Sequence, residues 1–184
     1  MQISLPTKVK EIIRDTNYQH PRPLYHAALK ADSILEIGLR EGYSTTSFLC
    51  GLRDGKQGHL WSIDWGKDPR TPKTADIIQR SEMAEYFTWI NRDVRLIPES
   101  WFESHSMDII FPDLNVLPLN GIPLTGLLQN CLLLMHKGSK MFLLGVNRNS
   151  EKEMFIANLD RDLYSYEIQP IQSGMAIITK EADG

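Results

Sequence analysis

The stretch from Ser33 to Asp64 constrains the fold of this chain more than any other segment. An apolar strand over 34–37 stops at Gly38, a helix opens after Gly42, and a second strand follows. Glycine has no Cβ and adopts positive φ easily, so a backbone with glycines here can turn tightly and approach a ligand. The free N–H groups at the start of the helix favour an anionic or electron-rich partner. Asp64 ends the second strand, where its carboxylate can accept hydrogen bonds from a ribose. The pattern predicts a nucleotide-type pocket.

The spacing of the glycines narrows the choice of nucleotide. A dinucleotide fingerprint requires G-x-G-x-x-G, in which the glycines let the helix pack closely around a pyrophosphate. The run here is Glu36-x-Gly38-x-x-x-Gly42-x-Ser44, and the bulky Arg40 stands where a pyrophosphate would approach. The sequence contains no P-loop G-K-[ST] motif. A nicotinamide cofactor would suit the acid that ends the second strand, but the glycine spacing disfavours it.

The E-I-G-x-x-x-G-x-S run resembles motif I of the class I S-adenosylmethionine-dependent methyltransferases. It is most similar to the small-molecule O-methyltransferase and cephalosporin-hydroxylase-like branch of that family. The resemblance runs from about Leu35 to Ile178, and its specific part is the stretch from Glu36 to Asp64. It implies that the glycine loop wraps the methionine part of the cofactor and that Asp64 holds the ribose hydroxyls. It also implies that Glu36 serves the cofactor ammonium or a loop amide.

Length and charge limit the domain count and the partners. A chain of 184 residues lies within the single-domain range of roughly 100–200 residues. We therefore expect a single S-adenosylmethionine-dependent methyltransferase-like domain over 1–184, with an N-terminal helical segment over 1–30. The formal net charge of −3 provides no general basic field, so a nucleic-acid partner is not expected.

The apolar segments and the two cysteines indicate in which cellular compartment the protein is expected. The sequence has no long apolar run that would cross a membrane, and its start lacks the layout of a signal peptide. We expect no membrane partner and, by default, a cytoplasmic location. Cys50 and Cys131 occupy apolar helical contexts without a C-x-x-C partner, which predicts reduced core residues.

Helical and strand patterns alternate along the chain, which predicts an α/β fold. We expect a Rossmann-like doubly wound, mostly parallel sheet with an antiparallel C-terminal strand, in a three-layer sandwich. Pro21 and Pro23 are expected to end the first helix, and 65–74 to form a loop. The expected helices lie around 9–13 and over 24–30, 44–53, 75–89, 124–135 and 154–163. The expected strands are 34–37, 60–63, 94–97, 107–111 and 140–144, and an antiparallel pair at 164–168 and 175–178.

Ligands of open α/β sheets bind outside the carboxyl ends of the strands, which gathers distant residues into one expected site. In similar methyltransferases the end of the third strand borders the adenine, so the resemblance implies that Ser100 or Trp101 touches the base. It also implies that Asp113, which ends the fourth strand, lies near the amino group of the cofactor or the substrate. The complete set of expected cofactor-binding residues is Glu36, Gly38, Gly42, Tyr43, Ser44, Asp64, Trp65, Ser100 and Trp101.

Structural roles remain open for several of these residues. Asp64 can cap a turn, and Trp65 can be an exposed loop aromatic as readily as an adenine platform. Trp101 can pack in the interior, Glu36 can be a charge buried for structural reasons, and Tyr43 can merely shield the loop.

The chemistry expected at this site depends on Asp113. Methyl transfer from a sulfonium is an in-line displacement in which positioning does much of the work, and a base or metal assists a hydroxyl acceptor. Metal-dependent relatives carry an acid cluster after the fourth and fifth strands. This sequence has Asp113 and Asn115 at the first place and Asn147 at the second. One carboxylate and two amides suit a hard divalent cation poorly, so we expect no metal and take Asp113 as the catalytic candidate.

The predicted function is a metal-independent S-adenosylmethionine-dependent methyltransferase acting on a small-molecule hydroxyl, amine or carboxylate. One alternative is a catalytically inactive module that binds S-adenosylmethionine or S-adenosylhomocysteine, which the missing acid cluster favours. The other alternative is a nicotinamide-dependent oxidoreductase. Segments 18–25, 65–73 and 114–123 are candidate walls for the acceptor, because specificity in this fold lies in loops and added segments. A homodimer is a further possibility.

Overall fold

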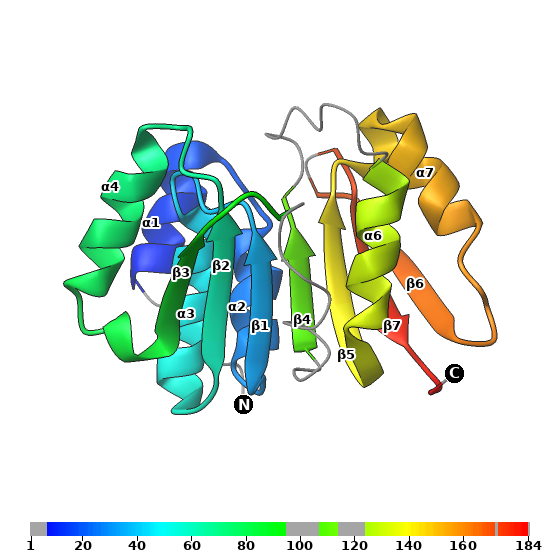
Figure 1. Cartoon of the computed structure of the whole chain (residues 1–184), viewed down its shortest axis with the longest axis horizontal. Helices are drawn as coiled ribbons and strands as arrows, with labels where there is room; N and C mark the ends of the chain where they lie inside the picture. The colour runs from blue at the N-terminus through cyan, green and yellow to red at the C-terminus, as the bar shows by residue number, and fades with distance from the viewer. Residues whose placement is uncertain (1–6, 95–106, 114–123, 172, 184) are drawn as a thin grey trace. The chain divides into compact units, whose positions relative to one another are not determined.

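The computed structural model describes residues 7–94, 107–113, 124–171 and 173–183. These residues contain a seven-stranded mixed sheet, mostly parallel, with antiparallel strands at its C-terminal end and with flanking helices (Figure 1). The predicted Rossmann-like α/β class is therefore confirmed. The contacts divide the chain into two compact units, Met1–Leu96 and Ile97–Gly184. The assignment of 1–184 to a single domain stays a prediction.

The first unit has three parallel strands in the order β3-β2-β1. Helices α1, α2 and α3 contact one another, and α3 contacts β2, so they cover one face of these strands (Figure 1). The elements are α1 (Thr7–Thr16), α2 (Pro21–Ala28), β1 (Ser33–Ile37), α3 (Tyr43–Gly55), β2 (His59–Asp64), α4 (Arg70–Gln79), the 3-10 helix η1 (Ala84–Tyr86) and β3 (Phe87–Asn91).

The second unit has four strands in the order β4-β5-β7-β6, of which β4 and β5 are parallel and the remaining pairs antiparallel. Buried Phe111, Leu128 and Met141 belong to its core. The elements are β4 (Met107–Pro112), α6 (Leu124–Leu133), β5 (Met135–Leu144), the 3-10 helix η4 (Val146–Arg148), α7 (Ser150–Ala157), β6 (Tyr164–Gln169) and β7 (Met175–Lys180). The predicted antiparallel C-terminal pair is confirmed.

The predicted helix over 75–89 was wrong beyond Gln79, and the strand predicted at 94–97 lies almost wholly outside the described residues. Helix α4 begins inside the predicted loop and ends at Gln79, and the third strand is Phe87–Asn91. Ser81 ends the helix, because its hydroxyl donates to the Ile78 carbonyl oxygen at 2.7 Å and accepts from the Met83 N–H at 3.1 Å. The aromatic and β-branched residues that follow favour a strand. Val94 is not in a strand, and 95–97 lie outside the described residues.

Three other boundaries also differ from the sequence expectation. Pro21 and Pro23 begin α2 instead of ending a helix, because the first turn of a helix loses no hydrogen bond to proline. Helix α7 begins earlier than predicted, since the side chain of Asn149 caps it by accepting from the Lys152 N–H at 3.1 Å. Strand β5 starts at Met135, five residues before the expected strand at 140–144.

Both cysteines are buried and free. Burial raises the pKa of each thiol, that of Cys131 to about 12, which suppresses the reactive thiolate form. None of the helices in the described part of the chain is long and apolar enough to cross a membrane.

The close packing of α2 on α3 depends on Gly51. A Cβ at Gly51 would lie 2.5 Å from the Ala28 Cβ and 2.6 Å from the Tyr25 carbonyl oxygen. We expect Gly51→Ala to lower the free energy of unfolding by about 1–3 kcal/mol, as overpacking does elsewhere. Urea titration followed by circular dichroism measures this change.

Gly126 in α6 provides the matched control, because a Cβ there would meet nothing within 4 Å. Alanine at this helical position should raise the free energy of unfolding by about 0.5–1 kcal/mol. Equal effects of the two substitutions would contradict the packing described for Gly51.

Candidate functional site

Glu36 lies at the centre of a buried hydroxyl cluster in the first unit. Its side chain is 0% exposed, and one carboxylate oxygen accepts a hydrogen bond of 2.5 Å from the Ser44 hydroxyl. The other oxygen accepts from the hydroxyls of Thr45 and Ser62, both at 2.7 Å. A buried carboxylate is costly unless it is hydrogen-bonded, and the N-terminus of a helix favours a negative charge. Because its partners belong to α3 and β2, Glu36 joins these elements to β1. Its contact with a cofactor stays a prediction.

The loop between β1 and α3 needs glycine at both predicted positions. Gly38 has a φ of 104° and donates its N–H to the Ile63 carbonyl oxygen at 2.8 Å. Gly42 has a φ of 75°, and its N–H donates to the Leu39 carbonyl oxygen at 2.8 Å. A Cβ at Gly42 would lie 2.6 Å from the Thr74 Cγ2. The loop therefore has the left-handed backbone that the sequence pattern predicts, and Thr74 packs closely on it at Gly42. Its approach to a ligand stays a prediction.

Asp64 connects the end of β2 to this glycine loop. Its Oδ2 accepts from the N–H groups of Leu39 at 2.9 Å and Arg40 at 3.3 Å. Its Oδ1 accepts from the Gly66 N–H at 2.8 Å. An ionised carboxylate offers about four acceptor positions, so Oδ1 with this amide can also accept from a ligand hydroxyl. The structure brings Asp64 and the glycine loop together, as the sequence predicts.

Aromatic side chains border the loop. The ring of Tyr43 lies edge-on to Tyr18 at a centroid distance of 5.7 Å, and Tyr18 lies 5.4 Å from His20. Tyr18 is 41% exposed and belongs to the segment expected to form an acceptor wall. Trp65 is 37% exposed, and the Lys67 ammonium lies 3.6 Å above its ring. These rings supply flat apolar surface beside the glycine loop, and their contact with a ligand stays a prediction.

An ionic cluster joins the same loop to the start of α4. Arg70 forms ion pairs with Glu41 and Asp68, and the Arg40 Nε lies 3.6 Å from an oxygen of each of these acids. Hydrogen bonds from Arg70 hold the pKa of Asp68 below its usual value. Such exposed pairs contribute little stability, so the cluster is secondary to Asp64 in fixing the loop.

Asp113 lies in the second unit, directly after β4, and is half-buried. Sequence reasoning missed the cation that acts on it. Lys152, in the first turn of α7, is 1% exposed and donates from Nζ to the Leu144 carbonyl oxygen at 2.7 Å. Burial lowers the pKa of Lys152, whereas the charge of Asp113 raises it. The sequence feature that could have indicated Lys152 is its position at a helix N-terminus, where the helix dipole disfavours a cation.

Asn147 packs on the turn between β6 and β7. Its N–H donates to the Ser173 carbonyl oxygen at 2.9 Å, and a Cβ at Gly174 would lie 2.7 Å from its side-chain amide. Asn147 therefore fixes the backbone that follows β5.

Some predicted residues fall outside the described part of the chain. Ser100, Trp101 and Asn115 are among them, so their roles stay predictions. Among the described residues, no group of three or more His, Cys, Asp or Glu side chains could hold a metal ion. Independence from metal also stays a prediction.

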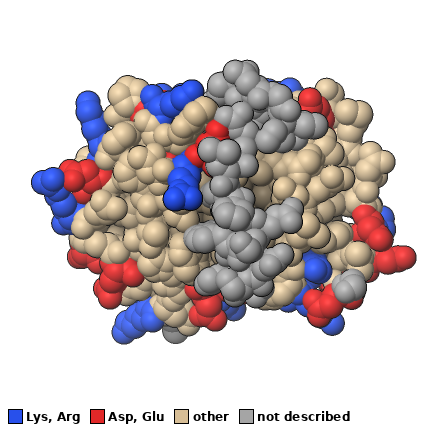
Figure 2. Space-filling model, viewed as in Figure 1, with Lys and Arg blue, Asp and Glu red and all other residues tan. Residues whose placement is uncertain are grey.

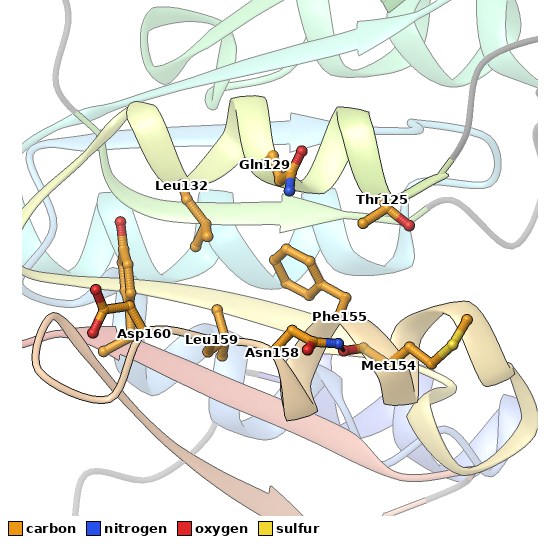
Figure 3. A pocket seen from close by; sticks show the side chains of 9 residues that line it. Thr125, Gln129, Leu132, Met154, Phe155, Asn158, Leu159 and Asp160 are labelled. Atoms are coloured by element: carbon orange, nitrogen blue, oxygen red, sulfur yellow. Dashed lines mark hydrogen bonds between the residues drawn. The ribbon is translucent and has the colours of Figure 1, made fainter.

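A cavity of about 360 Å³ lies between α6 and α7 in the second unit (Figure 3). Its wall is largely apolar and includes none of the predicted site residues, so it is separate from the expected chemistry. The lining residues are Thr125, Gln129, Leu132, Met154, Phe155, Asn158, Leu159, Asp160 and Tyr164.

The loop anchor at Asp64 yields a local prediction. Asp64→Asn removes the charge that strengthens the hydrogen bonds from the Leu39, Arg40 and Gly66 amides, each worth about 1.5–3 kcal/mol with a charged acceptor. We expect these three amides to exchange hydrogen roughly tenfold faster or more, as NMR can measure. Asp76→Asn is the control, because Asp76 is an exposed acid on α4 paired with Arg80. Unchanged exchange in the Asp64 variant would contradict the anchor.

Comparison with known proteins supports the fold and part of the family resemblance. A family model described as "Methyltransferase domain" matches residues 35–119, just under half of the chain. No curated protein sequence matches the chain at a significant level.

Three solved structures are similar over almost the whole chain, each with 16% sequence identity. An SAH-bound methyltransferase from Podospora anserina has a TM-score of 0.72 and covers 98% of this chain and 91% of its own. The O-methyltransferase TomG from Streptomyces achromogenes, in complex with SAM, has a TM-score of 0.69. The alignment covers 99% of this chain and 93% of TomG. An O-methyltransferase from Bacillus cereus in complex with SAH has a TM-score of 0.70. The alignment covers 98% of this chain and 94% of the Bacillus cereus chain. The resemblance expected from Glu36–Asp64 is thus confirmed at this level: residues 35–119 match a methyltransferase-domain family, and the chain shares the fold of these methyltransferase structures.

Proposed function

We propose that this protein is an S-adenosylmethionine-dependent methyltransferase that acts on a small-molecule acceptor without a metal ion. The observation that carries this proposal is the attachment of the glycine loop to Asp64 by hydrogen bonds from two consecutive loop amides. The family match over 35–119 includes this loop and Asp64 and supports the reaction class. The similar proteins from Podospora anserina, Streptomyces achromogenes and Bacillus cereus bind SAH or SAM, which supports the cofactor.

The described residues of the first unit fit an adenosyl sulfonium cofactor. The loop from Gly38 to Gly42 has glycine at both ends, where its backbone can contact the methionine part beside the start of α3. Asp64 has acceptor capacity left on Oδ1 for a ribose hydroxyl. Trp65 offers a half-exposed ring to the adenine. Glu36 is fully buried and contributes by fixing the first turn of α3, through which it positions Tyr43 and Ser44.

The transfer itself requires positioning more than acid–base power. When bound, S-adenosylmethionine supplies a methyl group activated by its sulfonium. The chain holds the acceptor in line with that group, and Asp113 orients or deprotonates the acceptor. Ser100 and Trp101 are proposed to contact the adenine.

The partners and location follow from the same proposal. We take a small molecule as the acceptor, because the TomG relative is named as acting in tomaymycin synthesis. On the face drawn in Figure 2, basic and acidic side chains are interspersed without a broad basic field, which argues against a nucleic-acid substrate. A cytoplasmic location and a homodimer complete the proposal.

Calorimetric titration tests the cofactor assignment. We expect the wild-type protein to bind S-adenosylmethionine and S-adenosylhomocysteine in preference to NAD. Asp64→Ala should weaken this binding by roughly 10- to 100-fold, because the hydrogen bonds to a charged acceptor are lost. Asp76→Ala, an exposed acid of the same unit, should leave binding unchanged. Preference for NAD, or binding insensitive to the Asp64 variant, would overturn the assignment.

Turnover with a panel of small hydroxyl, amine and carboxylate acceptors tests the reaction. Methyl transfer from radiolabelled S-adenosylmethionine that persists in the presence of a chelator is the expected result. Tight cofactor binding without turnover on any acceptor would favour a binding module over an enzyme.

A further inference from the structure

Helix α7 begins with a lysine that the fold buries. Lys152 is 1% exposed, whereas its neighbours Glu151 and Glu153 face solvent. An ammonium removed from water loses several kcal/mol of hydration, and the N-terminus of a helix repels a cation. Two unfavourable terms therefore act on this charge. A neutral side chain of the same length would avoid both, so the position calls for a compensating interaction.

Two groups at the ends of neighbouring strands supply that compensation. The Lys152 Nζ donates to the carbonyl oxygen of Leu144, the last residue of β5, at 2.7 Å. Asp113 follows β4, which pairs with β5 in parallel, and its charge favours the protonated ammonium. The ammonium thus lies at the carboxyl ends of both strands, where α/β folds place their ligands. The Asn149 cap, which accepts from the Lys152 N–H at 3.1 Å, fixes the backbone from which the side chain extends.

We propose that Lys152 is a positioning residue whose ammonium, held at the end of β5 beside the end of β4, orients the Asp113 carboxylate, so that Asp113 orients the N–H or O–H group of the acceptor. The proposal rests on the proposed function. A carboxylate near a fixed ammonium remains a hydrogen-bond acceptor, so Asp113 can orient an N–H or O–H group. A divalent cation would need several oxygen ligands where a fixed positive charge already stands. Lys152 therefore provides a physical reason for a metal-independent site.

A double-variant cycle tests the pairing without reference to activity. Lys152→Met and Asp113→Asn should each lower the Tm, the former by about 5–15 °C, because the first removes the hydrogen bond to Leu144 and each removes the attraction between the two charges. The double variant should lose clearly less than the sum of the two single losses. Lys140→Met replaces an exposed lysine of the same unit and should leave the Tm nearly unchanged. Additive losses in the double variant would overturn the pairing.

Kinetics separate positioning from simple structural support. Lys152→Met should lower kcat by roughly 10- to 1,000-fold while the KM for S-adenosylmethionine stays within about threefold. Lys152→Arg keeps the charge and should recover most of the lost kcat. A normal kcat in the Met variant, or equal loss in the Met and Arg variants, would overturn the role of the charge. If the wild-type protein binds no S-adenosylmethionine, the proposed function fails, and the Tm cycle still decides whether Lys152 and Asp113 are paired.

Discussion

The hydrogen bonds to the Glu36 carboxylate are the interaction on which the rest of the first unit depends. Three hydroxyls from α3 and β2 converge on this one buried side chain of β1. The bonds define where α3 begins, and so they define the span that the loop from Gly38 to Gly42 has to bridge. The loop in turn presents its amides to Asp64. Fixing the helix start is therefore a condition for the loop geometry on which the proposed cofactor site depends.

Glu36 and Asp64 belong to one sequence motif but differ in burial and in hydrogen-bond donors, and these differences give the two carboxylates different roles. Glu36 is fully buried and receives hydroxyl donors from the interior, so its oxygens serve the fold. Asp64 is only half-buried and receives backbone amides of the loop and of Gly66, so it keeps capacity toward solvent or a ligand. The family resemblance implies a cofactor role for both acids. The geometry favours Asp64 as the ligand contact and Glu36 as its support.

The local sequence pattern predicts the stretch from Ser33 to Asp64 well, because neighbouring residues determine where each strand and helix begins and ends. The region after Asp64 was harder to predict. Met83 and Phe87 fit a helical spacing, and Ile77 was expected in the same helix, yet Ile77 is 68% exposed and the helix ends before Ser81. That ending depends on two hydrogen bonds between the Ser81 side chain and the backbone, which a hydrophobic pattern does not indicate.

Long-range contacts set the other limits of prediction. The partners of Asp64 in the glycine loop lie 24 and 25 residues away, so the sequence could place the acid near the loop without giving its bonds. Lys152 was overlooked because Ser-Glu-Lys-Glu is typical of an exposed helix start. Its burial follows from the packing of α7 on the end of β5, which only tertiary structure shows.

The most direct test of this account is a crystal structure of the protein with S-adenosylhomocysteine. The account predicts a ribose hydroxyl within hydrogen-bond distance of the Asp64 Oδ1, with the homocysteine part against the loop from Gly38 to Gly42. A ligand bound elsewhere, or bound at this loop without contact to Asp64, would contradict it.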